Sequence, residues 1–325
     1  MKIHRRRVLE LSTGAIALPF VSRLAAAETY PARPVRLIVT VPAGGSPDII
    51  ARLIAQWLSQ RLGQPFVVEN RPGASSNIGT EVAMNAAPDG YTLLFAISSN
   101  AINASLYRHL HYDFMRDAAP IALISTIPLV MEVNTSVPAQ TVPEFIAYAK
   151  ANPGKINMAA PGMGSPLAVA GELFKMMAKV DMADVNYQGE APATPDLISG
   201  QVQVMFGVMP SSIGYIKSGK LRALAVTSPQ RQDALPDVPA LAEFLPGYEA
   251  AGWYGVVAQK GVPDDIVAKL NTEINAALAD STTRARLIEL GCVISAGSPA
   301  DFAKFIADET AKWAKVIAFA GIKAD

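Results

Sequence analysis

Two turns of the same design carry the chemistry that this sequence offers. Residues 42–47 read P-A-G-G-S-P, and residues 161–166 read P-G-M-G-S-P. Each turn has glycines, then a serine suited to cap a helix, then a proline suited to the first helical position. Such a turn directs free backbone N–H groups and the positive end of a helix dipole at one point, which favours an anion. Because one turn lies in each half of the chain, the pair predicts a site that holds a carboxylate from two sides.

Taken singly, either turn is also explained as an ordinary connection, because every α/β protein needs glycine turns between strands and helices. The usual groups for catalysis or metal binding are sparse. Beyond residue 27 the histidines are His109 and His111, and no further ligand cluster accompanies them, so no metal site is expected. Cys292 is the only cysteine; it stands in an apolar setting, and we interpret it as a core residue.

No G-x-S-x-G elbow and no phosphate-binding loop is present in the sequence. No base is visibly paired with a serine, so nucleophilic catalysis lacks its usual parts. The sequence therefore argues against an enzyme and predicts no cofactor. The alternative is an α/β hydrolase that uses Ser46 or Ser165 as its nucleophile.

The first 27 residues have the pattern of an export signal. Lys2 and the arginines at 5–7 precede an apolar stretch over residues 8–24, and three alanines at 25–27 supply a cleavage site. The order R-R-x-apolar-Leu also fits the twin-arginine form, with an ordinary secretory signal as the alternative. We expect removal near Ala27, a mature start near Glu28 and a periplasmic location.

Composition narrows the class of protein. Without residues 1–27, which carry five basic residues and one acidic residue, the chain has 23 basic and 27 acidic residues and a net charge of −4. With no basic stripe, nucleic acid is not expected as a partner. About 298 residues are enough for a large core and commonly form two domains. No later apolar run approaches the roughly 20 residues that span a bilayer.

Strand-like and helix-like periodicities alternate along the chain. Strands are predicted over residues 35–41, 66–69, 91–97, 156–160, 184–187, 202–208, 221–227 and 253–258. Helices are predicted over residues 47–62, from Thr141 onward, and over 167–179, 211–217, 263–280 and 298–319. This alternation predicts an α/β fold with mainly parallel sheets and flanking helices.

Several longer motifs resemble one family. They are Y-P-A-R-P-V-R-L-I-V at 30–39, V-V-E-N-R-P-G-A at 67–74, P-D-G-Y-T-L at 88–93, L-R-A-L-A-V-T at 221–227 and L-P-D-V-P at 235–239. This set resembles the substrate-binding proteins of tripartite tricarboxylate transporters, the Bug family. The resemblance spans essentially the whole mature chain, and E-N-R-P-G is its most specific run.

The resemblance implies a two-domain periplasmic-binding-protein fold of the type II kind, with hinge strands and a ligand cleft between the domains. Domain 1 would comprise residues 28–126 and 251–325, and domain 2 residues 127–250, with crossings near Thr126 and Ala250. The implied ligands are small organic acids. The implied partners are one large and one small integral-membrane transporter subunit, and the protein itself is expected as a monomer. A sensor that signals to a membrane kinase is the alternative role.

The resemblance also places ligand contacts in the two turns and in the segments beside them. The predicted ligand-binding residues are Ala43, Gly44, Gly45, Ser46, Asp48, Asn77, Ser98, Ser99, Gly162, Gly164, Ser165, Tyr187 and Gly189. The sequence departs from the family where D-V-N-Y at 184–187 replaces H-V-P-Y and where M-F-G at 205–207 replaces M-F-D. The missing aspartate would have paired with a ligand ammonium group, so Gly207 indicates a carboxylate without an amine, such as a dicarboxylic or aromatic acid.

Overall fold

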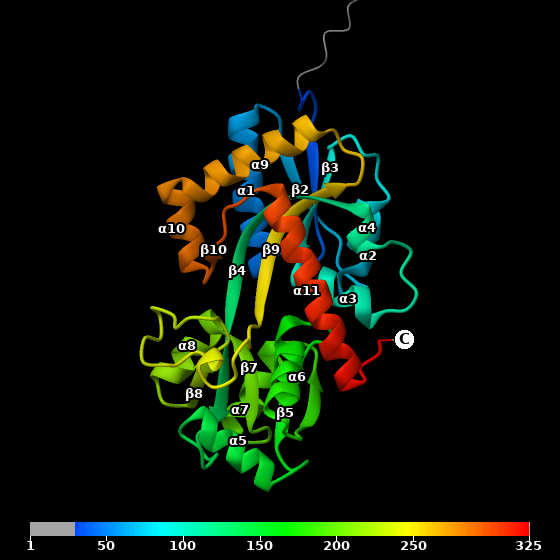
Figure 1. Cartoon of the computed structure of the whole chain (residues 1–325). Coiled ribbons are helices and arrows are strands. Elements are labelled where there is room, and N and C mark those ends of the chain that lie inside the picture. The colour runs from blue at the N-terminus through cyan, green and yellow to red at the C-terminus, as the bar shows by residue number, and fades with distance from the viewer. Residues whose placement is uncertain (1–29, 325) are drawn as a thin grey trace, which may run out of the picture.

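The computed structural model describes residues 30–324 of the chain (Figure 1). The predicted export signal and its cleavage near Ala27 lie outside the described residues. The elements form an upper and a lower part in Figure 1, which we call the first and the second lobe. None of the helices within residues 30–324 combines the length and the apolar character that a membrane crossing needs.

The first lobe is built on parallel strands whose residues are apolar on both faces. Its strands are β1 (Val35–Val39), β2 (Phe66–Asn70), β3 (Thr92–Ile97), β9 (Ala251–Gln259) and β10 (Val293–Ile294). Its helices are α1 (Ser46–Leu62), α2 (Asn77–Met84), α3 (Ser98–Leu106), α4 (Phe114–Asp117), α9 (Asp264–Ala279), α10 (Ser281–Glu289) and α11 (Pro299–Ala320). Strand β1 pairs in parallel with β2 and β3, and both faces are buried because α1 and α9 cover one and α11 the other.

The second lobe repeats this arrangement with fewer strands. Its strands are β5 (Asn157–Pro161), β6 (Ala183–Tyr187), β7 (Val204–Val208) and β8 (Leu221–Val226). Its helices are α5 (Val142–Ala151), α6 (Pro166–Ala178), α7 (Glu190–Ser199) and α8 (Met209–Lys217). Strand β5 pairs in parallel with both β6 and β7. Thr141 caps α5 by accepting a hydrogen bond from the Glu144 N–H, as predicted.

One long strand, β4 (Ala118–Asn134), runs through both lobes. From Ala118 to Pro128 it pairs antiparallel with β9, and from Leu129 to Val133 it pairs antiparallel with β7. The strand order is β2-β1-β3-β9-β4-β7-β5-β6. The antiparallel strands therefore lie at the centre, and the parallel strands lie on either side of them.

The predicted α/β fold with flanking helices is confirmed, but several of its elements, among them β4 and α3, were not predicted. Strand β4 was missed because Pro120 and Pro128 interrupt its apolar pattern; its pairing with β9 is irregular beside Pro120. Residues 98–100 begin α3. The Asn100 side-chain oxygen accepts a hydrogen bond from the Ile97 N–H at 2.8 Å and so closes the start of this helix.

The C-terminal helix α11 connects the two lobes by apolar packing. It starts as predicted, with the Ser298 hydroxyl accepting a hydrogen bond from the Asp301 N–H at 3.1 Å. Its buried Trp313 and Val316 share one core cluster with Ile102 of α3 and Phe174 of α6. In Figure 1 the helix runs alongside α3 toward α6. A helix of the first lobe thus completes the core of the second.

Replacing Trp313 should test this connection. Trp313→Ala should lower the free energy of unfolding by about 3–5 kcal/mol, because it opens a large cavity and removes the partner of Glu309 Oε2, which the indole N–H contacts at 2.9 Å. Urea unfolding followed by circular dichroism measures this change. Phe319→Ala on the same helix is the control, since Phe319 is 55% exposed and should cost under about 0.5 kcal/mol. A loss below about 1 kcal/mol at Trp313 would contradict the role of α11.

Candidate functional site

A cavity of about 170 Å³ lies where the two lobes meet. The first lobe contributes residues from the starts of α1 and α3, and the second lobe contributes residues from the start of α6 and the end of β7. Strands β4 and β9 contribute the remaining residues. The lining residues are Pro47, Ile97, Ser98, Ser99, Ile127, Leu129, Pro166, Leu167, Val208, Gly252 and Tyr254.

Four helices begin at this cavity. Pro47, Ser98 and Pro166 stand in the first turns of α1, α3 and α6, and Val208 is the N-cap residue of α8. The N-terminal ends of helices carry partial positive charge and unpaired N–H groups, so together they favour an anion. Within the described part of the chain, no lysine, arginine or histidine lines this cavity. An anion here would be held by backbone dipoles and hydroxyl groups rather than by an ion pair.

Asp48 gives the first turn its shape. Its carboxylate accepts hydrogen bonds from the Gly44 N–H at 2.9 Å, from Asn70 Nδ2 at 2.9 Å and from Arg52 Nε at 3.0 Å. Burial alone would raise the pKa of the Asp48 carboxyl, but hydrogen bonds from Arg52, Gly44 and Asn70 hold it below its ordinary value. Both oxygens of Asp48 are therefore engaged inside the protein, and the residue positions the turn.

Ser46 was predicted as the N-cap of α1, and this prediction is wrong. Gly45 is the N-cap residue, and Ser46 is the first residue of the helix. Burial raises the pKa of Tyr254 to about 12. Gly44 has φ of 89°, and a side chain there would meet no atom within 4 Å. The turn therefore presents its backbone to open space.

The second turn has the predicted design. Ser165 is the N-cap of α6; its hydroxyl accepts a hydrogen bond from the Ala168 N–H at 3.2 Å and donates one to the Pro161 carbonyl. Gly164 has φ of 72° and packs against Leu106 of α3, so a side chain at this position would be strained and crowded. The second turn is thus held directly against the first lobe.

Most of the predicted ligand-binding residues do not line the cavity. The Asn77 side-chain oxygen accepts hydrogen bonds from Asn103 Nδ2 at 2.8 Å and from the Tyr112 hydroxyl at 2.7 Å. The Tyr187 hydroxyl donates to Asp196 at 2.8 Å, and its carbonyl accepts from the Gly162 N–H. Gly189, the N-cap residue of α7, has open space around it. Of the thirteen predicted ligand-binding residues, Ser98 and Ser99 line the cavity. The two turns reach it only through Pro47 and Pro166, and Gly164 lines a separate pocket beside Ile317.

Sequence reasoning did not identify the strand residues that form the floor of the cavity. They are Ile127 and Leu129 of β4, Val208 of β7, and Gly252 and Tyr254 of β9. The residues of β4 and β9 could have been found from their position in the sequence, because they lie beside the crossings expected near Thr126 and Ala250. Successive side chains of a strand point to opposite faces, so alternate residues of these strands face the cavity.

The glycine at position 207 is required by two glutamates, the buried Glu132 and the half-buried Glu190. A side chain at Gly207 would clash with Glu132 Oε1 and lie 3.0 Å from Glu190 Oε1. Glu132 Oε1 accepts a hydrogen bond from the Ser212 hydroxyl at 3.0 Å, and burial raises the pKa of Glu132 to about 8. Glu190 Oε1 accepts from the Val208 N–H at 2.9 Å and from the Ser211 hydroxyl at 2.8 Å. The N-terminal end of α8 is therefore already occupied by a carboxylate of this chain.

Asp184, which stands where the family has a histidine, does not line the cavity between the lobes. Asp184 accepts from Lys175 Nζ at 2.9 Å, and Lys175 also pairs with Glu172 at 2.7 Å. Burial raises the pKa of Glu172 to about 7. Asp184 and Asn186 line a separate pocket of about 130 Å³ beside Ile317 of α11. This cluster supports α6 from behind and does not reach the cavity between the lobes.

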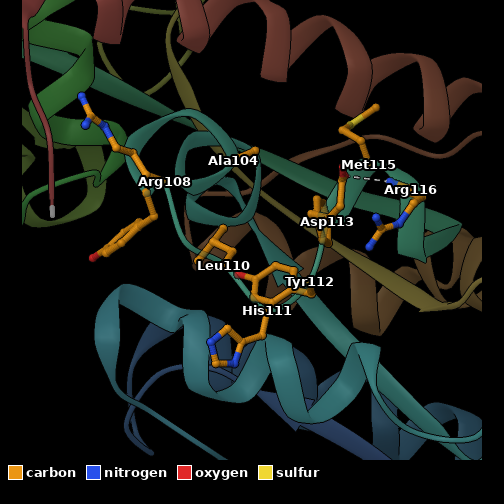
Figure 2. Close-up of a pocket in the computed structure, with 10 residues that line it drawn as sticks. Ala104, Arg108, Leu110, His111, Tyr112, Asp113, Met115 and Arg116 are labelled. Carbon is orange, nitrogen blue, oxygen red and sulfur yellow. Dashed lines mark hydrogen bonds between the residues drawn. The ribbon is translucent and has the colours of Figure 1, made fainter.

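Both histidines lie in the segment before α4, on the outside of the first lobe. Figure 2 shows the hollow of about 560 Å³ that this segment encloses, with His111 pointing toward α2. His111 Nδ1 is 3.2 Å from Glu81 Oε1, and Arg116 pairs with Asp117. Among residues 30–324, no group of three or more histidine, cysteine, aspartate or glutamate side chains is arranged to hold a metal ion.

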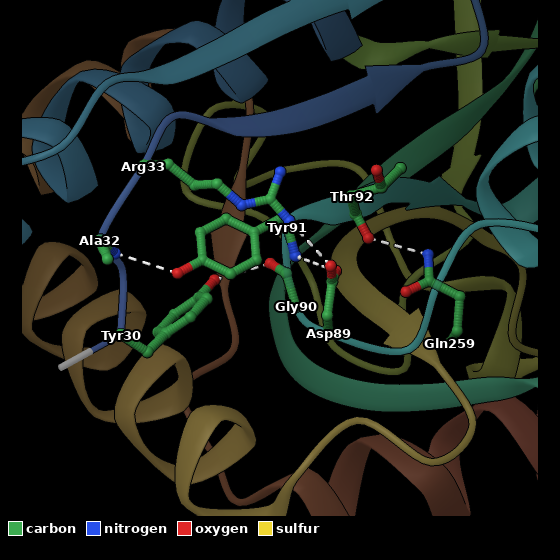
Figure 3. Close-up of polar contacts among 8 residues, drawn as sticks. All are labelled: Tyr30, Ala32, Arg33, Asp89, Gly90, Tyr91, Thr92 and Gln259. Carbon is green, nitrogen blue, oxygen red and sulfur yellow. Dashed lines mark hydrogen bonds and ion pairs between the residues drawn. The ribbon is translucent and has the colours of Figure 1, made fainter. Parts of the chain in front are cut away.

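Two of the motifs quoted above contact one another at the far edge of the first lobe (Figure 3). The Tyr30 hydroxyl donates to the Gly90 carbonyl at 2.7 Å, and the Tyr91 hydroxyl accepts from the Ala32 N–H at 3.0 Å. Arg33 pairs with Asp89 and lies over the Tyr91 ring. These residues fasten the start of β1 to β3, so their role is structural.

Two lobes with a ligand-sized cavity between them define a solute-binding protein. The chain belongs to the tripartite tricarboxylate transporter receptor family, because the family model described as "Tripartite tricarboxylate transporter family receptor" matches residues 50–322. Protein BugT of Bordetella pertussis is 37% identical over 316 residues, covering 96% of this chain and 95% of that protein. The family predicted from the sequence motifs is thereby confirmed.

Solved structures agree with this assignment. R. palustris Rpa4515, solved with adipate, is 37% identical, with a TM-score of 0.78 over 90% of this chain and 99% of that one. MatC from Rhodopseudomonas palustris, solved with bound malate, is 31% identical, with a TM-score of 0.75 over 89% of this chain and 100% of that one.

The role of Asp48 predicts a loss of stability. Asp48→Ala should lower the free energy of unfolding at pH 7 by about 2 kcal/mol, because Gly44 and Asn70 lose their partner. Because the pKa of Asp48 is lowered in the folded state, this contribution exists above its ordinary pKa and is lost as the pH falls. Urea unfolding at pH 7 and pH 3 measures both effects. The exposed Asp264 provides the control, and equal losses for the two alanine variants would contradict the prediction.

For Glu132 we expect the opposite pH dependence of the free energy of unfolding. Its pKa rises from 4.5 to about 8, so between these values the folded protein keeps a proton that the unfolded chain releases. The free energy of unfolding should therefore fall as the pH rises through this window. Glu132→Gln should remove this fall and leave the variant about 1–2 kcal/mol more stable than the parent at pH 9. The exposed Glu249→Gln is the control; parallel pH profiles for Glu132→Gln and the parent would show that Glu132 does not titrate in this way.

Proposed function

We propose that this protein is an extracytoplasmic receptor that holds a small carboxylate between its lobes and delivers it to a tripartite tricarboxylate-type membrane transporter. The observation that carries the proposal is the cavity bounded by helix starts from both lobes and lined by no cationic side chain within residues 30–324. Adipate and malate in the two R. palustris relatives support a carboxylate ligand. The ligand group would lie against the free N–H groups at the starts of α1, α3 and α6.

The proposed division into domains follows the pairing of β4. Residues 28–126 and 251–325 form domain 1 and residues 127–250 form domain 2, which is supported by the change of partner from β9 to β7 after Pro128. In this division the contacts to the carboxylate come from the turn at 43–46, from Ser98 and Ser99, and from the turn at 162–165. Asp48, Asn77, Tyr187 and Gly189 act indirectly, by shaping the segments beside these contacts.

Closure of the two lobes strengthens binding of the carboxylate and produces the conformation that the transporter recognises. Excluding water strengthens the attraction between the carboxylate and the helix dipoles, and charge-assisted hydrogen bonds are about twice as strong as neutral ones. A micromolar dissociation constant requires about −8 kcal/mol, which several such bonds can supply. The closed form is what one large and one small integral-membrane subunit would recognise. The receptor acts as a monomer in the periplasm, after removal of residues 1–27 by either export route.

Binding without catalysis is part of the proposal. The Ser165 hydroxyl is engaged by the Ala168 N–H and the Pro161 carbonyl. No hydrogen bond described for Ser46 or Ser165 joins its hydroxyl to a histidine or a carboxylate. A nucleophilic serine requires such a base.

The absence of an aspartate at residue 207 predicts a ligand without an amine. In isothermal titration, 4-methylpentanoate should bind about tenfold or more tightly than leucine, and glutarate more tightly than glutamate, because a buried ammonium group would lack a free carboxylate partner. The protein should first be unfolded and refolded to remove any carried ligand. Tight binding of aspartate or glutamate with no binding of plain acids would show the prediction to be wrong. The same titrations should be repeated with the Glu190→Gln variant, since Glu190 carries the carboxylate that lies within reach of position 207.

A further inference from the structure

The cavity between the lobes is lined by two kinds of group. Ser98 and Ser99 supply hydroxyl groups, and α1, α3 and α6 present their first turns. The floor residues and Leu167 of α6 have almost entirely apolar side chains. The floor residues are Ile127, Leu129, Val208, Gly252 and Tyr254.

The backbone donors of this floor are already used. The Val208 N–H donates to Glu190 Oε1 at 2.9 Å, and the Leu129 N–H donates to Thr227 Oγ1 at 2.9 Å. Ile127 and Gly252 are partners in the β4–β9 ladder. The N-terminal end of α8, which would otherwise favour an anion, faces the carboxylate of Glu190. Three helix starts are thus open to a ligand anion, whereas the start of α8 is closed by Glu190.

We propose that the ligand is a monocarboxylate with a compact hydrocarbon body, branched or aromatic, whose apolar end packs on this floor. This inference rests on the proposed function and names the ligand class of the same site. The carboxylate lies at the starts of α1, α3 and α6, and the hydrocarbon body contacts Leu129, Val208 and the Tyr254 ring. A second carboxylate at the floor would meet apolar carbon atoms and acceptor oxygens, and burying it without donors costs several kcal/mol.

Matched acids of equal length test the inference by isothermal titration of the refolded protein. Hexanoate is compared with adipate, and butanoate with succinate, so that each pair differs only in a methyl or a carboxylate at the far end. The monocarboxylate should bind about tenfold or more tightly in each pair. Along the series from acetate to pentanoate, affinity should rise about fourfold for each methylene group until the floor is covered.

The outcomes separate this inference from the proposed function. If dicarboxylates bind as tightly as the matched monocarboxylates or more tightly, the inference is wrong and the carboxylate receptor stands. If no acid of either class binds, or raises the melting temperature in a thermal-shift screen, the receptor proposal fails and the inference fails with it.

Two variants locate the effect at the floor. Val208→Thr places a hydroxyl on the floor with little change of volume and should weaken hexanoate about fivefold. Val185→Thr on β6, outside the cavity lining, should leave the affinity unchanged. Glu190→Gln should narrow the ratio between hexanoate and adipate by strengthening adipate several-fold, since it replaces an acceptor with an amide donor beside Val208. If the ratio of the hexanoate and adipate affinities is unchanged in both Val208→Thr and Glu190→Gln, the hydrocarbon end of the ligand does not lie at the floor.

Discussion

Strand β4 must satisfy backbone hydrogen bonds in both lobes, and the position of the cavity depends on this constraint. The strand exchanges β9 for β7 as its partner between Pro128 and Leu129, and the side chains at this exchange form the cavity floor. Because the ladder fixes the register on both sides, the floor residues cannot turn away independently. The starts of α1 and α6, which come from different lobes, are thereby brought to the two sides of one space.

The electrostatics of the cavity come from backbone dipoles and neighbouring carboxylates rather than from cationic side chains. Asp48 and Glu190 play parallel roles, since each accepts a hydrogen bond from a backbone N–H at or near a helix start. Asp48 shapes a turn whose backbone stays open, whereas Glu190 occupies the start of α8. The same kind of interaction therefore leaves one helix start open to an anion and closes another.

Much of the fold follows from local sequence signals, whereas much of the site does not. Ser165 capped α6 as predicted because its signal is contained within a few residues, and the parallel strands followed from their apolar runs. Strand β4 was missed because prolines mask a strand held in place by β7 and by β9, the latter more than a hundred residues away. The Glu190 contact with the Val208 N–H and the inward bond of Tyr187 to Asp196 depend on tertiary packing, which no spacing rule encodes.

The bridging position of α11 has a consequence for how the protein is made. Trp313 and Val316 fill a core whose other members are synthesised much earlier, including Phe145 and Phe174. Until α11 has been synthesised, the second lobe exposes the apolar surface that these side chains will cover. The core of the middle segment therefore closes only when a helix encoded far downstream packs against it.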